Sequence, residues 1–213
     1  MHDPRLQPVP PYSALIFDCD GTLVDSGPAH EKAWRQALAD RGVELDPDWY
    51  RERTGLSADV LLAELEAATG RAIDHAAVEA AAIDAFGGLV DMVLPNEPVV
   101  TVAQENHGRV PLAVASGGSR TAVEVSLRAI GVYPLFDAVV TRDDVSRGKP
   151  APDIYLLAAE RLGVHPGECV VYEDTDEGMA AARAAGMRVI DVRPAPATIR
   201  SSDAVPDSAT SLV

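Results

Sequence analysis

The most informative stretch of the sequence is Ala14-Leu15-Ile16-Phe17-Asp18-Cys19-Asp20-Gly21-Thr22. Its apolar first part predicts a buried strand over residues 13–19. Two carboxylates follow one residue apart, and Asp18 and Asp20 would point the same way if the strand continued. Gly21 then allows the chain to turn away. Acids at this point stand where open α/β sheets bind their ligands, although a solvated strand end has the same pattern.

The chain after Pro98 alternates between helical and strand-like segments. We expect strands at 110–115, 136–141, 169–172 and 188–192, separated by helices at 98–107, 119–130, 153–162 and 175–185. Repeated βα units with continuously apolar strands predict an α/β fold, with a Rossmann-like parallel sheet and helices on both faces. The proline-rich start and the stretch 201–213 are expected to be loose ends.

Residues 27–95 interrupt this alternation with helical signals alone. We expect helices at 28–41, at 57–69 and from Asp74 through Val93, the last with a bend at Gly87-Gly88. The prediction is a core domain built from residues 1–26 and 96–213, carrying an inserted small α-helical cap domain of residues 27–95. Since the insert follows the first strand, it would lie directly above Asp18 and Asp20.

The composition restricts the partners of this 213-residue chain. A net charge of −15, without clusters of Lys and Arg, argues against binding to nucleic acid or to an anionic membrane. The N-terminus has no apolar signal core, so we expect a cytoplasmic protein. Cys19 and Cys169 lie in apolar runs and are expected to be reduced and buried. We expect a monomer or a weak homodimer.

Polar residues follow three further strands of the predicted sheet. Ser116 and Gly117 offer a hydroxyl and backbone amides that can hold an anion, or simply cap a helix. Lys149 stands in a proline-braced loop, where its ammonium could stabilise a phosphate or remain solvated. Glu173 and Asp174 end the next strand, and four acids at one sheet edge would repel one another unless a hard cation such as Mg²⁺ were bound.

Taken together, these strand ends predict one phosphoryl-transfer site. One carboxylate would attack phosphorus and form an aspartyl-phosphate. The second acid would protonate the leaving oxygen and later deprotonate the hydrolytic water. The substrate would be a small phosphorylated metabolite.

This set of motifs resembles the haloacid dehalogenase-like superfamily over residues 13–193. The resemblance implies that Asp18 is the nucleophile and Asp20 the acid/base. It also implies that Ser116 and Lys149 hold the transferring phosphoryl group. The implied Mg²⁺ ligands are Asp18, the Asp20 backbone carbonyl and Asp174, with Glu173 either a ligand or a neighbour that supports the ligands. The helical insert resembles the C1-type cap of the β-phosphoglucomutase-like branch, which also contains sugar-phosphate phosphatases.

Within that branch, the stretch 24–34 resembles the cap entry shared by β-phosphoglucomutases and fructose-1-phosphate/6-phosphogluconate phosphatases. The mutases carry a cap arginine after a Gly-x-Ser turn, whereas Gly55-Leu56-Ser57 is followed here by Ala58. They also use a cap lysine, and residues 59–95 contain none. These departures favour a Mg²⁺-dependent phosphatase over a hexose-phosphate mutase.

Two other functions remain as alternatives. A phosphonoacetaldehyde hydrolase would need a cap lysine, for which Lys32 is the only candidate. A non-catalytic binding module would have no need of both Asp18 and Asp20. For substrate contact, Arg53, Thr54 and the Gly55 turn are candidates to face the leaving group, by their position in the insert. His30 is either a helper between cap and core or a packed interface histidine.

Overall fold

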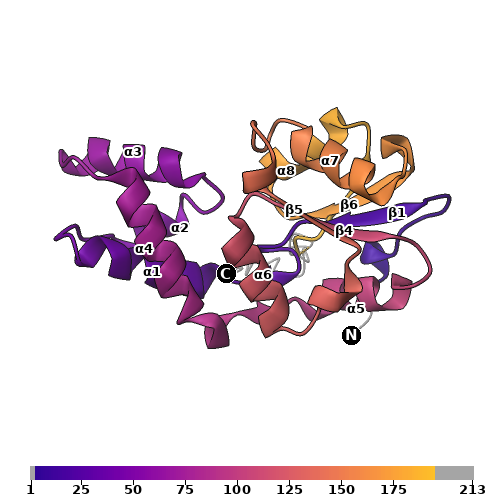
Figure 1. The fold of residues 1–213 in the computed structure, drawn as a ribbon, viewed down its shortest axis with the longest axis horizontal. Coiled ribbons are helices and arrows are strands. Elements are labelled where there is room, and N and C mark those ends of the chain that lie inside the picture. Colours follow the sequence, from indigo (N-terminus) through magenta and orange to yellow (C-terminus); the bar gives the residue numbers. More distant parts are fainter. Residues whose placement is uncertain (1–2, 195–213) are drawn as a thin grey trace, which may run out of the picture.

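The computed structural model describes residues 3–194 and has two parts, a sheet-centred core and a helical cap (Figure 1). The core holds one five-stranded parallel sheet in the order β5-β4-β1-β6-β7. Its strands are β1 (Ala14–Phe17), β4 (Leu112–Ser116), β5 (Ala138–Thr141), β6 (Cys169–Glu173) and β7 (Arg188–Asp191). The predicted α/β fold with a helical insert is confirmed.

Helices cover both faces of the sheet, so β1 is apolar throughout rather than alternating. The covering helices are α5 (Glu97–Asn106), α6 (Arg120–Ala129), α7 (Asp153–Leu162) and α8 (Asp176–Ala184). Leu15 and Phe17 pack in an apolar core with residues of α5 and α6. Ala14 and Ile16 pack in a second core with residues of α7 and α8, on the opposite side of the sheet in Figure 1.

The cap is formed by helices α1 (Gly27–Ala39), α2 (Pro47–Arg51), α3 (Ala58–Thr69) and α4 (His75–Gly87). It has an apolar core of its own, which includes Leu38, Leu62 and Val78. The five-residue α2 was not predicted, because one turn and a half is too short to show a helical period. The prediction that the helix after Asp74 extends to Val93 is wrong: α4 ends at Gly87 and a separate 3₁₀ turn, η2 (Val90–Met92), follows.

The two connections between cap and core pair with each other, which the sequence did not indicate. Strand β2 (Val24–Asp25) lies antiparallel to β3 (Leu94–Pro95), with Val24 opposite Pro95 and Asp25 opposite Leu94. Two-residue strands carry no periodic signal, so only the fold reveals them. We propose that the cap domain begins at Gly27 and ends at Pro95, so that both domain boundaries lie next to this ribbon.

The N-terminal segment packs on the core, so the expectation of a loose end is wrong for residues 3–12. Leu6 is 2% exposed, and the Tyr172 hydroxyl donates to its carbonyl at 2.8 Å. Arg188 on the edge strand β7 donates to the Val9 carbonyl at 2.6 Å. The stretch 201–213, also expected to be loose, lies outside the described residues.

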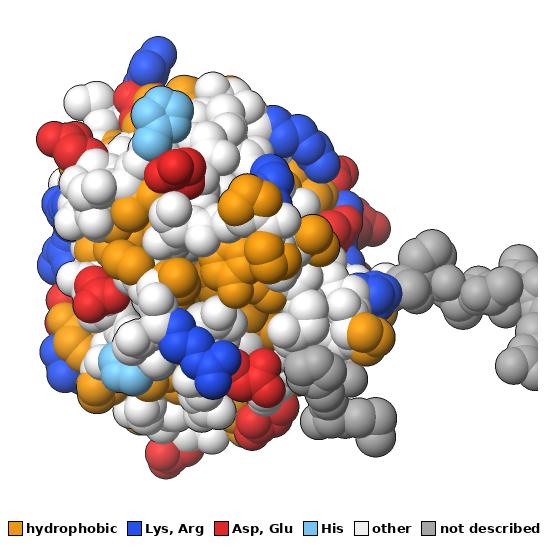
Figure 2. All heavy atoms as spheres, turned by 90° about the vertical axis from the view of Figure 1, so that its right-hand side faces the viewer, with side chains coloured by type: hydrophobic (Ala, Val, Ile, Leu, Met, Phe, Trp, Pro, Cys, Tyr) orange, Lys and Arg blue, Asp and Glu red, His pale blue; other side chains and the backbone are white. Residues whose placement is uncertain are grey.

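The end of the core that faces away from the cap is shown in Figure 2, where hydrophobic side chains gather among scattered charges of both signs. The carboxyl ends of all five strands open at the other end, because β1 runs toward the cap and the sheet is parallel. Within residues 3–194, no helix has the length and apolar character needed to cross a bilayer. Cys19 and Cys169 are buried and free, as predicted.

Candidate active site

The chain turns sharply after β1, and this turn separates Asp18 from Asp20. The strand ends at Phe17 rather than at Cys19, because the Cys19 carbonyl accepts N–H groups from residues 22, 23 and 24 at 2.8–3.2 Å. The two carboxylates therefore do not share one direction, as a continued strand would require. Gly21 has φ +86°, and a Cβ there would lie 2.1 Å from Asp174 Oδ2, so the turn accepts only glycine.

A buried ion cluster, which we call the floor, lies beneath this turn and consists of Asp18, Lys149, Glu173 and Asp174. The Lys149 ammonium donates to Asp18 Oδ1 at 2.7 Å and to Glu173 Oε1 at 2.5 Å. The side chains of Asp18 and Lys149 are 8% and 10% exposed, and that of Glu173 is fully buried. Asp18 follows β1, Lys149 lies in the segment after β5, and Glu173 and Asp174 stand at the end of β6. The parallel topology brings these strand ends to one edge of the sheet.

Protein donors saturate the Glu173 carboxylate. Its Oε1 accepts from Lys149 and from the Tyr155 hydroxyl at 3.1 Å. Its Oε2 accepts from the backbone of Asp174 and from both the backbone and the hydroxyl of Thr175, at 2.8–2.9 Å. Five donors on one carboxylate hold it in a single orientation. They favour a supporting role for Glu173 over direct metal ligation.

The side chain of Glu173 also requires a glycine on the neighbouring helix. A Cβ at Gly178, in the first turn of α8, would lie 1.7 Å from Glu173 Oε1. The carboxylate therefore lies against bare backbone. No sequence motif indicated Gly178, because the requirement arises only when α8 packs beside the end of β6.

The floor carries an excess of negative charge. Carboxylate oxygens of Asp18, Glu173 and Asp174 lie within 4.8 Å of one another, and within residues 3–194 Lys149 offers the one ammonium in contact with them. Burial, and then the charge of Glu173, raise the pKa of Asp174 to about 6. Burial raises the pKa of Asp18 well above its usual value, although Lys149 opposes this. Two uncompensated charges on hard oxygen donors fit a divalent cation such as Mg²⁺.

Asp20 faces the cap and has different partners. The Ser26 hydroxyl donates to Asp20 Oδ1 at 2.6 Å, and His30 Nε2 lies 3.3 Å from the same oxygen. The His30 ring stacks on Phe86 of α4, with centroids 4.2 Å apart. Burial would raise the pKa of Asp20, but the contacts with His30 and Ser26 outweigh it and lower the pKa. His30 thus links the cap to this carboxyl group, and Asp20 offers the cation no side-chain oxygen in the cluster.

The loop after β4 lies beside Asp20. Ser116 is buried, and its hydroxyl accepts from the Gly118 amide at 3.0 Å. A Cβ at Gly118 would lie 3.4 Å from Asp20 Oδ2, whereas one at Gly117 would meet nothing within 4 Å. The helix cap of α6 is Ser119 and not Ser116, since the Ser119 side chain accepts from the Ala122 amide. Ser116 therefore remains free of a capping role.

Cap residues approach the site to different extents. Gly55 has φ +97°, and a Cβ there would lie 3.9 Å from Thr175 Cγ2, so this cap turn meets the loop after β6. The Arg53 guanidinium is held by Glu64 at 2.8 Å and lies over the Trp49 ring. Lys32 is exposed and stands two residues from His30, so it projects from a different face of α1.

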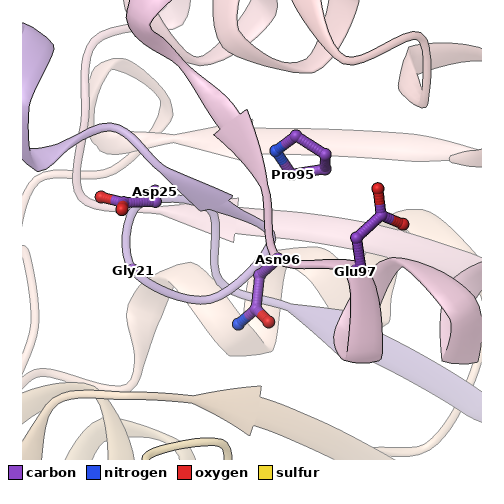
Figure 3. A pocket seen from close by; sticks show the side chains of 5 residues that line it. All are labelled: Gly21, Asp25, Pro95, Asn96 and Glu97. Atoms are coloured by element: carbon purple, nitrogen blue, oxygen red, sulfur yellow. The ribbon is translucent and has the colours of Figure 1, made fainter. Parts of the chain in front are cut away.

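A separate cleft of about 530 Å³ lies at the connections between cap and core (Figure 3). Its lining residues are Gly21, Asp25, Pro95, Asn96 and Glu97. The cleft includes none of the floor residues and neither Asp20 nor Ser116. Its walls are the start of α5 and the β2–β3 ribbon, which connects cap and core and which we call the hinge.

Sequence reasoning missed several residues that shape this site. Thr22 donates to Asp174 Oδ1 at 3.1 Å, and Ser26, Tyr155 and Thr175 hold Asp20 or Glu173 as described above. Thr22 and Ser26 flank the opening motif, so their nearness was visible in the sequence. Tyr155 lies in an apolar helix face, where nothing distinguishes it from core packing.

The haloacid dehalogenase-like hydrolase family matches residues 12–186 of the chain. The chain belongs to this family. It is 42% identical over 183 residues to the fructose-1-phosphate phosphatase YqaB of Escherichia coli, covering 85% of this chain and 97% of that protein. It is 36% identical to hexitol phosphatase A of the same organism, covering 84% and 82% of the two chains.

A solved structure agrees with this membership. The structure of CbbY from Rhodobacter sphaeroides in complex with phosphate has a TM-score of 0.77 and 29% identity, covering 84% of this chain and 85% of that one. The predicted family is confirmed, and the chain is a phosphoric monoester hydrolase of the sugar-phosphate phosphatase kind.

Proposed function

We propose that this hydrolase is a Mg²⁺-dependent phosphatase of small sugar phosphates of the fructose-1-phosphate or 6-phosphogluconate type. The observation that carries the proposal is that Asp18 and Asp20 have different hydrogen-bond partners. Asp18 is held by Lys149 beneath the turn, while Asp20 is held by Ser26 and His30 toward the cap. Two carboxyl groups in such different surroundings suit two different roles.

In the first step, an Asp18 oxygen attacks phosphorus and the bond from phosphorus to the sugar oxygen breaks. Asp20 gives a proton to that leaving oxygen. An arriving phosphate adds negative charge beside Asp20, which favours its protonated form despite the lowered pKa of the resting site. Lys149, Ser116 and the amide of Gly117 hold the phosphoryl oxygens.

In the second step, a water molecule attacks the phosphoryl group on Asp18. Asp20, now ionised, accepts the proton of that water. Phosphate leaves, and the carboxylate of Asp18 is restored. Mg²⁺ would be held by Asp18, Asp174 and the Asp20 carbonyl, with Glu173 in support. When bound, it would neutralise the excess charge of the floor and polarise the phosphoryl group.

Water is proposed as the acceptor because the cap offers no second anion seat. Its residues 27–95 contain thirteen acidic and six basic side chains. Arg51 and Arg53 are each paired with carboxylates of the cap, and Lys32 projects away from His30. A bisphosphate intermediate, as in a phosphoglucomutase, would need an unpaired cation facing the site. The same position of Lys32 disfavours a phosphonoacetaldehyde hydrolase.

The test is a phosphate-release assay with Mg²⁺ over a panel of sugar phosphates that includes fructose 1-phosphate, 6-phosphogluconate and a hexose 1-phosphate. Free phosphate from the first two supports the proposal. A hexose 1-phosphate converted to the 6-phosphate without release would identify a mutase instead. No turnover, together with no uptake of Mg²⁺ or a phosphoryl analogue, would favour a binding module.

A further inference from the structure

An ion pair joins the cap to the core at a distance from the reacting groups. Arg142 Nη2 lies 2.6 Å from Glu79 Oε1, and the two side chains are 33% and 24% exposed. Glu79 belongs to cap helix α4, and Arg142 begins the 3₁₀ turn η4 (Arg142–Asp144) of the core. Among residues 3–194, this is the one arginine–carboxylate pair between helices α1–α4 and the core.

The core end of this pair is tied to the proposed phosphate-holding loop. The backbone N–H of Arg142 donates to the Gly118 carbonyl at 3.2 Å. The preceding residue, Thr141, pairs in register with Ser116 across β5 and β4. Arg142 is thus fixed relative to Ser116 and Gly118, and Gly118 in turn lies beside Asp20.

The cap end of the pair is tied to His30. Glu79 and Phe86 are seven residues apart on α4, so they share one face and stand two turns, about 10 Å, from each other. Phe86 is almost fully buried and stacks on His30, which reaches Asp20. In Figure 1, α4 crosses from the cap toward α6 of the core. One helix therefore contacts Arg142 of the core through Glu79 and His30, the neighbour of Asp20, through Phe86.

We propose that the Glu79–Arg142 pair is a latch that fixes α4 so that His30 meets Asp20. Glu79 and Arg142 are then positioning residues, since neither contacts the reacting groups. The inference rests on the proposed roles of His30 and Asp20. A partly exposed ion pair has a modest strength, so the expected effect on the population in which His30 meets Asp20 is at most about tenfold and not an all-or-none switch.

A charge-swap experiment tests the latch. Glu79→Arg and Arg142→Glu each place like charges together and should lower kcat/KM for the preferred sugar phosphate about fivefold to tenfold. The double variant restores opposite charges and should return kcat/KM to within about twofold of the wild type. The singles should affect p-nitrophenyl phosphate less, because its leaving group needs less help from Asp20. Arg128→Glu, which breaks a pair with Glu124 inside α6, is the matched control and should change neither value.

Amide hydrogen exchange provides a readout that does not depend on turnover. The single variants should exchange faster in residues 75–97, which include α4 and strand β3, at unchanged melting temperature, and the double variant should match the wild type. If the wild type releases no phosphate from any sugar phosphate, the proposed function fails while the exchange data still test the latch. Failure of the double variant to restore slow exchange, or singles that behave like Arg128→Glu, would overturn the latch.

Discussion

The floor and the cap-facing side of the active site shift the pKa values of two neighbouring aspartates in opposite directions. Asp18 belongs to the floor, where burial raises its pKa and every partner comes from the core. Asp20 lies two residues later, and its contacts with Ser26 and His30 come from the entrance of the cap and lower its pKa. Asp18 is therefore held by a fixed cluster, whereas the surroundings of Asp20 depend on the position of the cap.

The largest effect is expected at the floor. Asp18→Asn removes the nucleophile with little change in shape, so kcat should fall by at least about 10⁴-fold. Phosphate release from the preferred sugar phosphate measures this. The matched control is Asp25→Asn, an equal change at an exposed acid of the hinge, which should retain activity within about twofold. Asp18→Asn retaining more than about a hundredth of the activity would exclude the proposed nucleophile.

On the cap-facing side, the effect should depend on the leaving group. Asp20→Asn removes the proton donor, and kcat for a sugar phosphate should fall by about 10²–10⁴-fold. The rate of the first step should fall less with p-nitrophenyl phosphate, because its leaving group is stable without a proton. Burst kinetics with that substrate should then show phosphoryl-enzyme accumulating, because Asp20 also activates the water. An equal fall in the rate of the first step with both substrates, without accumulation of phosphoryl-enzyme, would contradict the assigned role.

The fixed position of Glu173 in the floor can be tested by a substitution that changes no charged residue. Gly178→Ala should displace Glu173 and destabilise the fold by about 1–3 kcal/mol, because the new methyl group overlaps the carboxylate. Gly87→Ala, at a helical glycine with open space around it, should be neutral or stabilising by up to about 1 kcal/mol. Chemical denaturation compares the two. Similar values would mean that Glu173 can move aside, and the floor would then not be fixed.

The smallest effect concerns the charge of the floor. Without a cation, the raised pKa of Asp174, about 6, makes the folded state hold a proton more tightly than the unfolded chain. This contribution to stability is present at low pH and is lost as the pH rises through about 6. Mg²⁺ binds the ionised form, so it should raise the melting temperature by a few degrees at pH 7.5 and by much less at pH 5.

Asp174→Asn serves as the control for this pH dependence, since it removes the titrating ligand. Its melting temperature should respond weakly to Mg²⁺ at both pH values. A wild-type shift that is as large at pH 5 as at pH 7.5 would show that Asp174 does not set the affinity of the site for the cation.

The core of the site could be predicted because each motif residue follows a strand. A parallel sheet brings the carboxyl ends of its strands to one edge, so Asp18, Ser116 and Asp174 had to converge once the strands were recognised. The family resemblance then supplied a role for each residue. The pairing of β2 with β3 and the short α2 were missed, because elements of two to five residues show no period.

Local patterns and the order of the strands were enough to predict the α/β fold, the helical insert and the set of acids, hydroxyl and lysine. Four features became visible only in the folded structure: the direction of each carboxylate, the saturation of Glu173, the need for Gly178 and the pairing of Glu79 with Arg142. Most of these features depend on residues that are far apart along the chain. Lys149 and Asp18 are 131 residues apart, and Arg142 and Glu79 are 63 apart. Contacts of this kind exist only after the cap and the core have packed, and no local periodicity encodes them.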